Sequence, residues 1–425
     1  MSLLCLQDNH VVKAIWEGSE RVLRPRRHAL WIAKHVDELD ERVINILQAV
    51  GFHHILKTTV TLEDVALQLG LPIEGNAVTS ISSGPLTLFC QQLLGHVPPE
   101  NTIRGNRIKL SWLNNTFRQL PHDAPDEVVE QYARAYMLLI IGSILMPDTS
   151  ASMVHLMYLP LLADLQMVVN YSWASAVLAC LYRALDHGTR VDQDNIGDCM
   201  ILLQCWAWER ITCIAPQIHE VNQDDIYGGA VFPVAKRWCR TTQSIFHDTT
   251  TLQQFRQKLD DLTPKQFIWT PYRCDEIRRM ITVQLPPTSR AVVPLICFSV
   301  VEFHHSDRVI RQLGFRQLLP QTPMNLDKIH KEDMRGRADW DWQEHHKQWI
   351  GLWNDHQNRF FNSVPFHKNG HLRDEYEYMQ WYISHTIRYL APIVDDSSDE
   401  EYDLDQQQHF QAPSAYRSSP PYDVP

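Results

Sequence analysis

The chain has 425 residues, of which 44% are hydrophobic and 21% charged, as in an ordinary soluble globular protein with room for two or three subdomains. The net charge is −11, but seven acids lie between Asp395 and Asp405, which leaves −4 for the rest of the chain. A nearly neutral body has no general attraction for nucleic acid, although local basic clusters can still form.

The sequence predicts neither secretion nor a membrane anchor. Residues 1–27 are polar and basic, so we expect them to be weakly ordered, and the opening MSLLCLQDNH lacks the features of a signal peptide. The most apolar helical stretch, 136–146, is shorter than the about 20 residues that cross a bilayer. The nine cysteines form no Cys-x-x-Cys pair, so we expect them to be reduced and mostly buried.

The first elements in chain order are a helix, a short strand and a second helix. From 28 to 50, apolar residues recur three and four apart, which predicts the first helix. The β-branched run 58–62 predicts a strand. The second helix should begin after Thr61, which can cap it together with Asp64, and should end at Gly70.

The middle of the chain predicts three longer helices, over 126–146, 171–185 and 194–211. Several alanines in the second allow a partner helix to approach closely. The third has a broad apolar face that includes Trp206, so we expect Trp206 in the core. Trp208 lies off that face, and we expect it to contact a neighbouring segment.

The C-terminal half mixes one strand with further helices. The run 292–303 is short, apolar and partly β-branched, which predicts a buried strand. Ser306 should then cap a short helix that ends at Gly314. Helical spacing returns over 341–356 and over 372–387.

These elements together predict a mainly α fold: a multi-helix globular domain over 28–392 with a few short β-strands. The tail 393–425 is acidic, then rich in Gln and Pro, and is predicted to be disordered because it cannot bury a core. Ser397 and Ser398 precede three acids, which suits phosphorylation by an acid-directed kinase. The alternative is a merely solvated end.

Motifs of common catalytic sites are absent from the sequence. It lacks the Gly-Asp-x-His and Gly-Asn-His-Glu strings of phosphoprotein phosphatases, a Gly-rich phosphate loop and a Gly-x-Ser-x-Gly elbow. Nothing marks out a lysine for a pyridoxal cofactor. We therefore predict no catalytic residue and no cofactor.

Histidines beside carboxylates offer a metal or enzyme site as an alternative. Imidazole and carboxylate groups one helical turn apart can share an ion. Adjacent histidines on a helix point about 100° apart, however, so surface or hydrogen-bonded core histidines are the simpler interpretation, and no metal is predicted. The residues concerned are His304, His305, His345 and His346, beside Glu302, Asp341 and Glu344.

A tryptophan stripe offers a second alternative. Trp342, Trp349 and Trp353 lie at spacings of seven and four, so they could stack nucleic-acid bases if they were exposed. Tryptophan at helical spacing usually packs a core, and the nearby charges are mixed. Core packing is therefore the simpler interpretation.

A pair of arginines after the predicted strand is the last candidate. Arg308 and Arg311 could form an interaction or anion site. With Asp307 and Glu302 they could instead form an internal ion-pair network that locks the strand to the following helix, which is the simpler interpretation.

Seven blocks occur in the order found in one known family. They are TVTLEDVALQLGLPIEG (59–75), RAYMLLIIGSILMPDTSASMVHLMYLPLLADL (134–165), YSWASAVLACLYRAL (171–185), IGDCMILLQCWAWERI (196–211), FIWTPY (267–272), VPLICFSVVEFHHSDRVIRQLGFRQLLP (293–320) and WDWQEHHKQWIGLWNDH (340–356). Together they resemble the plant mobile domain of the MAINTENANCE OF MERISTEMS-like proteins over roughly residues 22–395.

The resemblance implies a helical, nuclear, non-enzymatic interaction module tied to meristem maintenance, transposon silencing and genome stability. It implies nuclear protein partners, among them a phosphatase 7-like protein. The family's "phosphatase 7 long form" and "aminotransferase-like" labels bring no catalytic residues, because those motifs are absent. A transposon-derived nucleic-acid-binding protein is the first alternative, and a phosphatase-related enzyme is the second.

One departure concerns the N-terminal part of the domain. Where the family has a further helix and strand, Leu56-Lys57-Thr58 joins two blocks directly. The strand predicted over 58–62 would thereby lose its hairpin partner, and an isolated short strand is not stable. We expect it to pair elsewhere or to fray.

Overall fold

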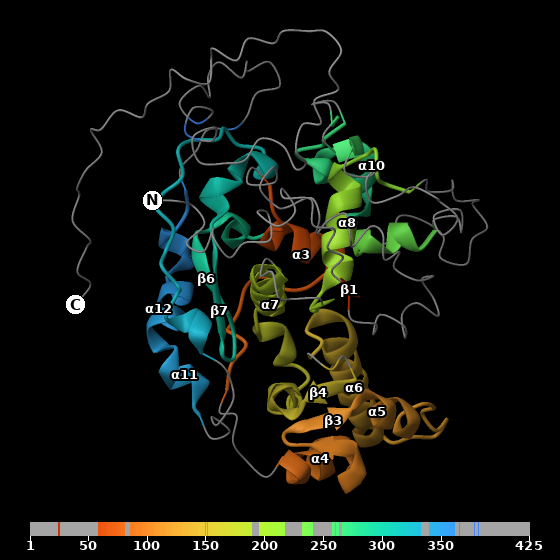
Figure 1. Ribbon diagram of the computed structural model, residues 1–425. Coiled ribbons are helices and arrows are strands. Elements are labelled where there is room, and N and C mark those ends of the chain that lie inside the picture. Colours follow the sequence, from red (N-terminus) through yellow and green to blue (C-terminus); the bar gives the residue numbers. More distant parts are fainter. Residues whose placement is uncertain are drawn as a thin grey trace, which may run out of the picture. The chain divides into compact units, whose positions relative to one another are not determined.

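The computed structural model describes residues 24–25, 58–80, 86–148, 150, 152–188, 195–216, 232–240, 257–259, 261–262, 266–332, 340–361, 365, 378 and 381. In this part of the chain the fold is mainly helical with a few short strands, which confirms the predicted class (Figure 1). The helices predicted over 28–50 and 372–387 lie outside the described residues, apart from Tyr378 and Trp381.

Helices supply most of the described structure, and short 3-10 turns join them. The α-helices are α3 (Leu62–Leu69), α4 (Leu86–Leu94), α5 (Leu110–Thr116), α6 (Asp126–Ile140), α7 (Trp173–Gly188), α8 (Met200–Arg210), α10 (Asp275–Met280), α11 (Trp342–His345) and α12 (Lys347–Asn354). The turns that matter for the site are η7 (Val234–Arg240), η9 (Pro271–Arg273), η10 (Pro287–Arg290), η11 (Ser306–Arg308), η12 (Ile310–Leu313) and η13 (Ile329–Lys331).

The strands form three small sheets. β1 (Arg24–Pro25) runs parallel to β5 (Asn195–Ile196). β2 (Ile103–Arg104), β3 (Arg107–Lys109) and β4 (Met153–His155) form an antiparallel sheet. β6 (Val293–Cys297) and β7 (Val300–His304) form an antiparallel hairpin.

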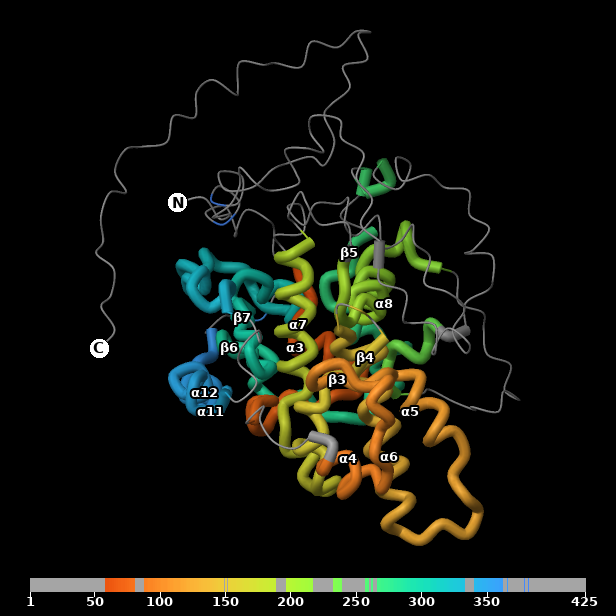
Figure 2. The backbone as a smooth tube through the Cα atoms, turned by 60° about the horizontal axis from the view of Figure 1, so that its bottom comes forward, coloured from red at the N-terminus to blue at the C-terminus, as the bar shows by residue number. Residues whose placement is uncertain are grey.

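Helix α3 begins and ends as predicted. The side chain of Thr61 accepts a hydrogen bond from the N–H of Asp64, and the Asp64 carboxylate accepts one from the N–H of Thr61 at 2.8 Å. Gly70 ends the helix in the left-handed conformation, with φ at 72°. α3 packs against both α7 and α8 and contributes side chains to the hydrophobic core, and Figure 2 shows it beside α7.

The strand predicted over 58–62 is wrong, because residues 58–61 are extended without joining a ladder. A side chain takes the place of a partner strand. The N–H of Thr59 donates to the Gln312 Oε1 atom at 2.6 Å, and Gln312 Nε2 donates to the Thr59 carbonyl at 2.8 Å. The Tyr182 hydroxyl donates to the Val60 carbonyl at 2.6 Å. The backbone of this segment is therefore satisfied by the side chains of Gln312 and Tyr182, and it pairs with no other strand among the described residues.

The single strand predicted over 292–303 is wrong, because this run folds back as the β6–β7 hairpin. Phe298 makes the turn with φ at 49°, and its N–H donates to the Val78 carbonyl at 2.9 Å. The Phe298 ring is fully buried and contacts Tyr158 edge to face. Burial of this ring holds a left-handed conformation that phenylalanine seldom adopts. Helix α7 packs against both strands, and α12 packs against β6.

The helix predicted over 126–146 is confirmed, but its length was underestimated in the membrane argument. α6 continues through a π-helical turn, so Asp126–Leu145 is one helix of 20 residues, and its most apolar 18-residue window has a mean hydropathy of 1.3. Length and composition alone would let this helix cross a membrane. The buried Arg134 side chain donates to the carbonyls of Leu162 and Ala163, so it joins this helix to the end of the 3-10 turn that follows β4.

The helices predicted over 171–185 and 194–211 are also present, with different starts. α7 runs from Trp173 to Gly188. α8 begins only at Met200, because Asn195–Ile196 form β5 and Asp198 adopts a positive φ of 68°. Trp206 is fully buried, which confirms its place in the core.

The last described helices tie the end of the domain to its beginning. Asp341 caps α11 by accepting from the N–H groups of Gln343 and Glu344. Trp353 on α12 is 2% exposed, and its indole N–H donates to the carbonyl of Gly75 at 2.8 Å. Segments 278 residues apart in sequence are thereby joined.

Candidate functional site

A buried ion pair joins α3 to α8. A guanidinium nitrogen of Arg210 lies 2.8 Å from the Asp64 carboxylate, and both side chains are fully buried. The Tyr272 hydroxyl donates to the same carboxylate at 2.7 Å, and Gln68 donates to Tyr272 at 3.1 Å. Burial alone would lower the pKa of Arg210, but Asp64 and Tyr272 raise it above its ordinary value. The pair is therefore charged and structural.

A second buried carboxylate extends this arrangement to η7. Glu209 on α8 accepts from the Trp238 indole at 2.9 Å and lies 3.2 Å from the Arg237 guanidinium. Burial raises the pKa of Glu209 and Arg237 opposes it. The ring of Trp208 lies 5.1 Å from that of Trp238, so Trp208 contacts a neighbouring segment as predicted.

The predicted network of Arg308, Arg311, Asp307 and Glu302 divides among different neighbours. Glu302 on β7 bonds instead to Arg183 on α7 and to His330 on η13. Arg308 lies beside Asp307; burial lowers the pKa of Arg308 and Asp307 opposes that shift. The Arg311 guanidinium lies over the ring of Trp269, 4.5 Å from its centroid.

Two further arginines meet the same short stretch of chain as Arg311, residues 311–315. Arg273 lies across Gly314 so closely that a Cβ atom at this position would collide with its guanidinium group, and it donates to the Leu313 carbonyl at 2.8 Å. Arg290 lies over the ring of Phe315, 5.0 Å from its centroid. We call this set the arginine–aromatic surface, and its members are Trp269, Arg273, Arg290, Arg311 and Phe315.

The local fold explains why these side chains meet. The segment 306–314 was predicted as one helix capped by Ser306, but it forms the two 3-10 turns η11 and η12. Ser306 does not cap either turn, because its hydroxyl donates to the Arg290 carbonyl at 2.7 Å and so fixes η10 beside η11. Gly314, with φ at 82°, ends η12 as predicted and lets the chain pass beneath Arg273.

Glu63 is the acid associated with this surface. It lies in the first turn of α3 and is half-buried. Burial, and then the charge of Asp64, raise the pKa of Glu63 to about 7, although Arg210, Arg273 and Arg290 oppose the shift. At neutral pH this carboxyl therefore neutralises the two exposed arginines only in part.

His304 has a structural position rather than an exposed one. Its ring is fully buried at the end of β7, with Nδ1 2.9 Å from the Ala291 carbonyl. Its Nε2 accepts from the N–H of Leu62 at 3.4 Å, so it closes the first turn of α3. Burial lowers the pKa of His304 to about 4, and the ring is neutral at physiological pH. This agrees with the hydrogen-bonded core interpretation.

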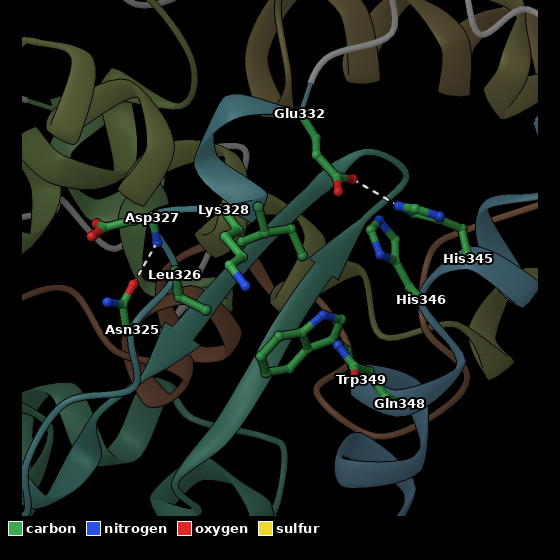
Figure 3. A pocket seen from close by; sticks show the side chains of 10 residues that line it. Asn325, Leu326, Asp327, Lys328, Glu332, His345, His346, Gln348 and Trp349 are labelled. Carbon is green, nitrogen blue, oxygen red and sulfur yellow. Dashed lines mark hydrogen bonds and ion pairs between the residues drawn. The ribbon is translucent and has the colours of Figure 1, made fainter. Parts of the chain in front are cut away.

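His345 and His346 reach a pocket of about 680 Å³ between the η13 segment and α11–α12 (Figure 3), whereas His305 lies apart from it, with Nδ1 3.8 Å from an Asp307 carboxylate oxygen. His345 Nε2 lies 2.8 Å from Glu332 Oε2, and the buried His346 ring lies 5.5 Å from that of Trp342. The lining residues are Asn325, Leu326, Asp327, Lys328, Ile329, Glu332, His345, His346, Gln348 and Trp349.

This pocket brings together two of the histidines considered for the enzyme alternative. A histidine–carboxylate pair can serve as a general base that removes a proton from water or from a side-chain nucleophile. No Ser, Thr, Cys or Tyr is among the described residues that line the pocket. Within the described part of the chain, no group of three or more His, Cys, Asp or Glu side chains could hold a metal ion.

The remaining predicted site residues differ in how far the structure describes them. Trp342 and Trp353 are buried, which agrees with core packing, and Trp349 is half-buried at the pocket. Ser397 and Ser398 lie outside the described residues, so their phosphorylation stays a prediction.

Sequence reasoning missed Arg273, Arg290, Trp269 and Phe315. A signal was present, because seven arginines and four acids lie between positions 273 and 316. The pairing of each arginine with a particular ring or carbonyl depends on the positions of the 3-10 turns. No periodic pattern in the sequence predicts these turns.

With this geometry in view, comparison with known proteins identifies the class. The family model described as plant mobile domain matches residues 54–383, so the chain belongs to the plant mobile domain family. This confirms the resemblance carried by the seven sequence blocks. No solved structure matches the chain.

Three Arabidopsis thaliana proteins are similar to the chain. Protein MAIN-LIKE 1 is 31% identical over 92% of this chain and 79% of its own length. Protein MAINTENANCE OF MERISTEMS is 28% identical over 91% of this chain and 83% of its own length. Serine/threonine-protein phosphatase 7 long form homolog is 36% identical over 79% of this chain, but the match spans only 25% of that longer protein.

Proposed function

We propose that this chain is a non-enzymatic interaction module of the nucleus, which acts in meristem maintenance, transposon silencing and genome stability. The observation that carries the interaction role is the arginine–aromatic surface. Its guanidinium groups are held in place by rings and a carbonyl, and Arg273 and Arg290 are exposed. Arginine beside aromatic rings is enriched where proteins recognise partners.

The buried charges support a structural rather than a catalytic use of the ionisable groups. Asp64 and Arg210 neutralise each other between α3 and α8, and Glu302 serves Arg183 and His330. These pairs join segments that are far apart in the sequence. The name of one relative, MAINTENANCE OF MERISTEMS, supports the meristem role, and nuclear proteins, with a phosphatase 7-like protein among them, are the proposed partners.

Affinity purification from plant nuclei, read by mass spectrometry, tests this function. The tagged full chain is compared with a triple variant of the surface, Arg273→Glu, Arg290→Glu and Arg311→Glu. A matched control carries Arg118→Glu, Arg278→Glu and Arg279→Glu, which change the net charge equally at exposed positions elsewhere.

We expect specific partners with the wild type and the control, and their loss with the surface variant. Recovery of the same partners by all three proteins would remove the surface from the proposal, and recovery of nothing above background would overturn the interaction role. A fluorescent fusion of the full chain tests the nuclear location. Retention of bound DNA or RNA in place of proteins would favour the nucleic-acid alternative.

A further inference from the structure

The charges around the arginine–aromatic surface are unbalanced. Asp64 is already bound to Arg210 at 2.8 Å. Among the described residues, no carboxylate oxygen lies within 4.0 Å of Arg273 or Arg290. Two exposed guanidinium groups therefore retain their charge while lying near the same glutamate, Glu63.

The contacts of these arginines fix the plane of the guanidinium groups. Arg290 lies over Phe315, and one nitrogen of Arg273 is held by the Leu313 carbonyl. A guanidinium group presents five N–H donors in a planar fork, so stacking leaves donors at its edges for an oxyanion. A guanidinium group that is already held in place loses less side-chain entropy when a ligand binds.

The arrangement favours a concentrated negative charge over a long polyanion. Bases of single-stranded nucleic acid bind by stacking on open ring faces, but a guanidinium group already covers one face of Trp269 and one of Phe315. A phosphate monoester instead brings nearly two charges and three acceptor oxygens to one point.

We propose that the arginine–aromatic surface binds a phosphorylated side chain on a peptide segment of a partner protein. Arg273 and Arg290 supply the donors to the phosphate oxygens, and Arg311 lies over Trp269 on the same surface. This inference rests on the proposed function, because it names the partner class that the same surface would recognise.

Fluorescence anisotropy with the purified full chain tests the inference. The probe is a labelled ten-residue peptide with one phosphoserine between glycines and alanines, and the comparison peptides carry Ser or Glu at that position. We expect the phosphoserine peptide to bind at least about tenfold more tightly than either comparison peptide, because charge-assisted hydrogen bonds to a dianion are the stronger ones.

Matched variants locate the binding on the molecule. Arg273→Ala and Arg290→Ala should each weaken binding of the phosphoserine peptide by about tenfold or more, since each removes charged hydrogen bonds. Arg273→Lys should recover only part of the loss, because an ammonium group keeps the charge without the fork. The control Arg278→Ala should leave the affinity unchanged, and unaltered circular dichroism and melting temperature show that each variant folds.

The outcomes separate this inference from the proposed function. Equal binding of the three peptides, or equal binding by Arg290→Ala and the wild type, would overturn the phosphate assignment. Tighter binding of a ten-residue oligothymidine would favour nucleic acid, and full displacement by inorganic phosphate at the peptide's own concentration would assign the site to free phosphate. If nuclear partners depend on the surface but the phosphopeptide does not bind, the interaction role stands and only this inference fails.

Discussion

Arginine is used in two opposite ways within a short distance in this fold. Arg210 is fully buried, lies 2.8 Å from Asp64 and is further fixed between the rings of Trp206 and Tyr272. Arg273 and Arg290 are exposed and lie on carbonyl and ring surfaces instead. The guanidinium group thus stabilises the fold where a buried carboxylate lies against it, and we propose that it serves recognition where no carboxylate of the described residues does.

The largest effect should come from breaking the buried pair. Asp64→Ala leaves the Arg210 charge buried without its carboxylate and also removes the capping interaction with Thr61. We expect a loss of about 3–5 kcal/mol in the free energy of unfolding, measured by urea denaturation. Arg290→Ala on the surface should change it by less than about 0.5 kcal/mol. Similar losses of unfolding free energy in Asp64→Ala and Arg290→Ala would contradict the distinction between the buried pair and the arginine–aromatic surface.

The next effect concerns the neutral histidine beneath α3. Because burial lowers the pKa of His304 to about 4, the folded state binds fewer protons than the unfolded state between pH 6.5 and 4. Stability should therefore fall as the pH falls through this window, by on the order of 3 kcal/mol from this group. His304→Gln should flatten the pH dependence of the unfolding free energy. An unchanged slope in His304→Gln would exclude this residue as the cause.

A smaller effect is expected where a side chain replaces a strand. Gln312→Leu keeps the size of this buried residue but removes both hydrogen bonds to Thr59. We expect a loss of about 2 kcal/mol and faster amide exchange at Thr59 and Val60, measured by hydrogen exchange. Exchange as slow as in the wild type would show that the Gln312 amide does not hold this segment.

The smallest effect should appear at Glu63, between the two regions. Its pKa is raised to about 7, so the folded state holds a proton that the unfolded state loses above about pH 4.5, and this contribution to stability declines as the pH rises to 7. Glu63→Gln should remove that decline, a gain of about 1 kcal/mol at pH 8 relative to pH 5. Asp275→Asn, an exposed acid on α10, serves as the control, and equal gains in both variants would contradict the assignment.

Elements defined by caps and periodicity were predictable from the sequence. The Thr61–Asp64 capping box and Gly70 bounded α3 correctly, and the apolar stripes located α6, α7 and α8. The β6–β7 hairpin was not predictable, because its turn uses Phe298, which buried contacts hold in a conformation typical of glycine. The extended segment 58–61 was mistaken for a strand because its partner is the side chain of Gln312, 253 residues away.

The site was also predictable only in part, because it too depends on contacts between residues that are far apart in the sequence. Arg308 and Arg311 were singled out from their spacing, but Arg308 remains beside Asp307 and only Arg311 lies on the surface. Arg273 and Arg290 join Arg311 through 3-10 turns whose positions depend on tertiary hydrogen bonds such as Ser306 to Arg290. Local sequence patterns carry no information on such long-range contacts.

The indole of Trp353 has a practical consequence for work with shortened forms of the protein. Its hydrogen bond to the Gly75 carbonyl joins α12 to the loop after α3. A fragment that ends before Trp353 would lack this ring. It would expose the Gly75 carbonyl and the apolar residues that the ring covers. Because Tyr378 is also buried and the family match ends at 383, expression boundaries, and fusions that must preserve the fold, should be placed beyond residue 383.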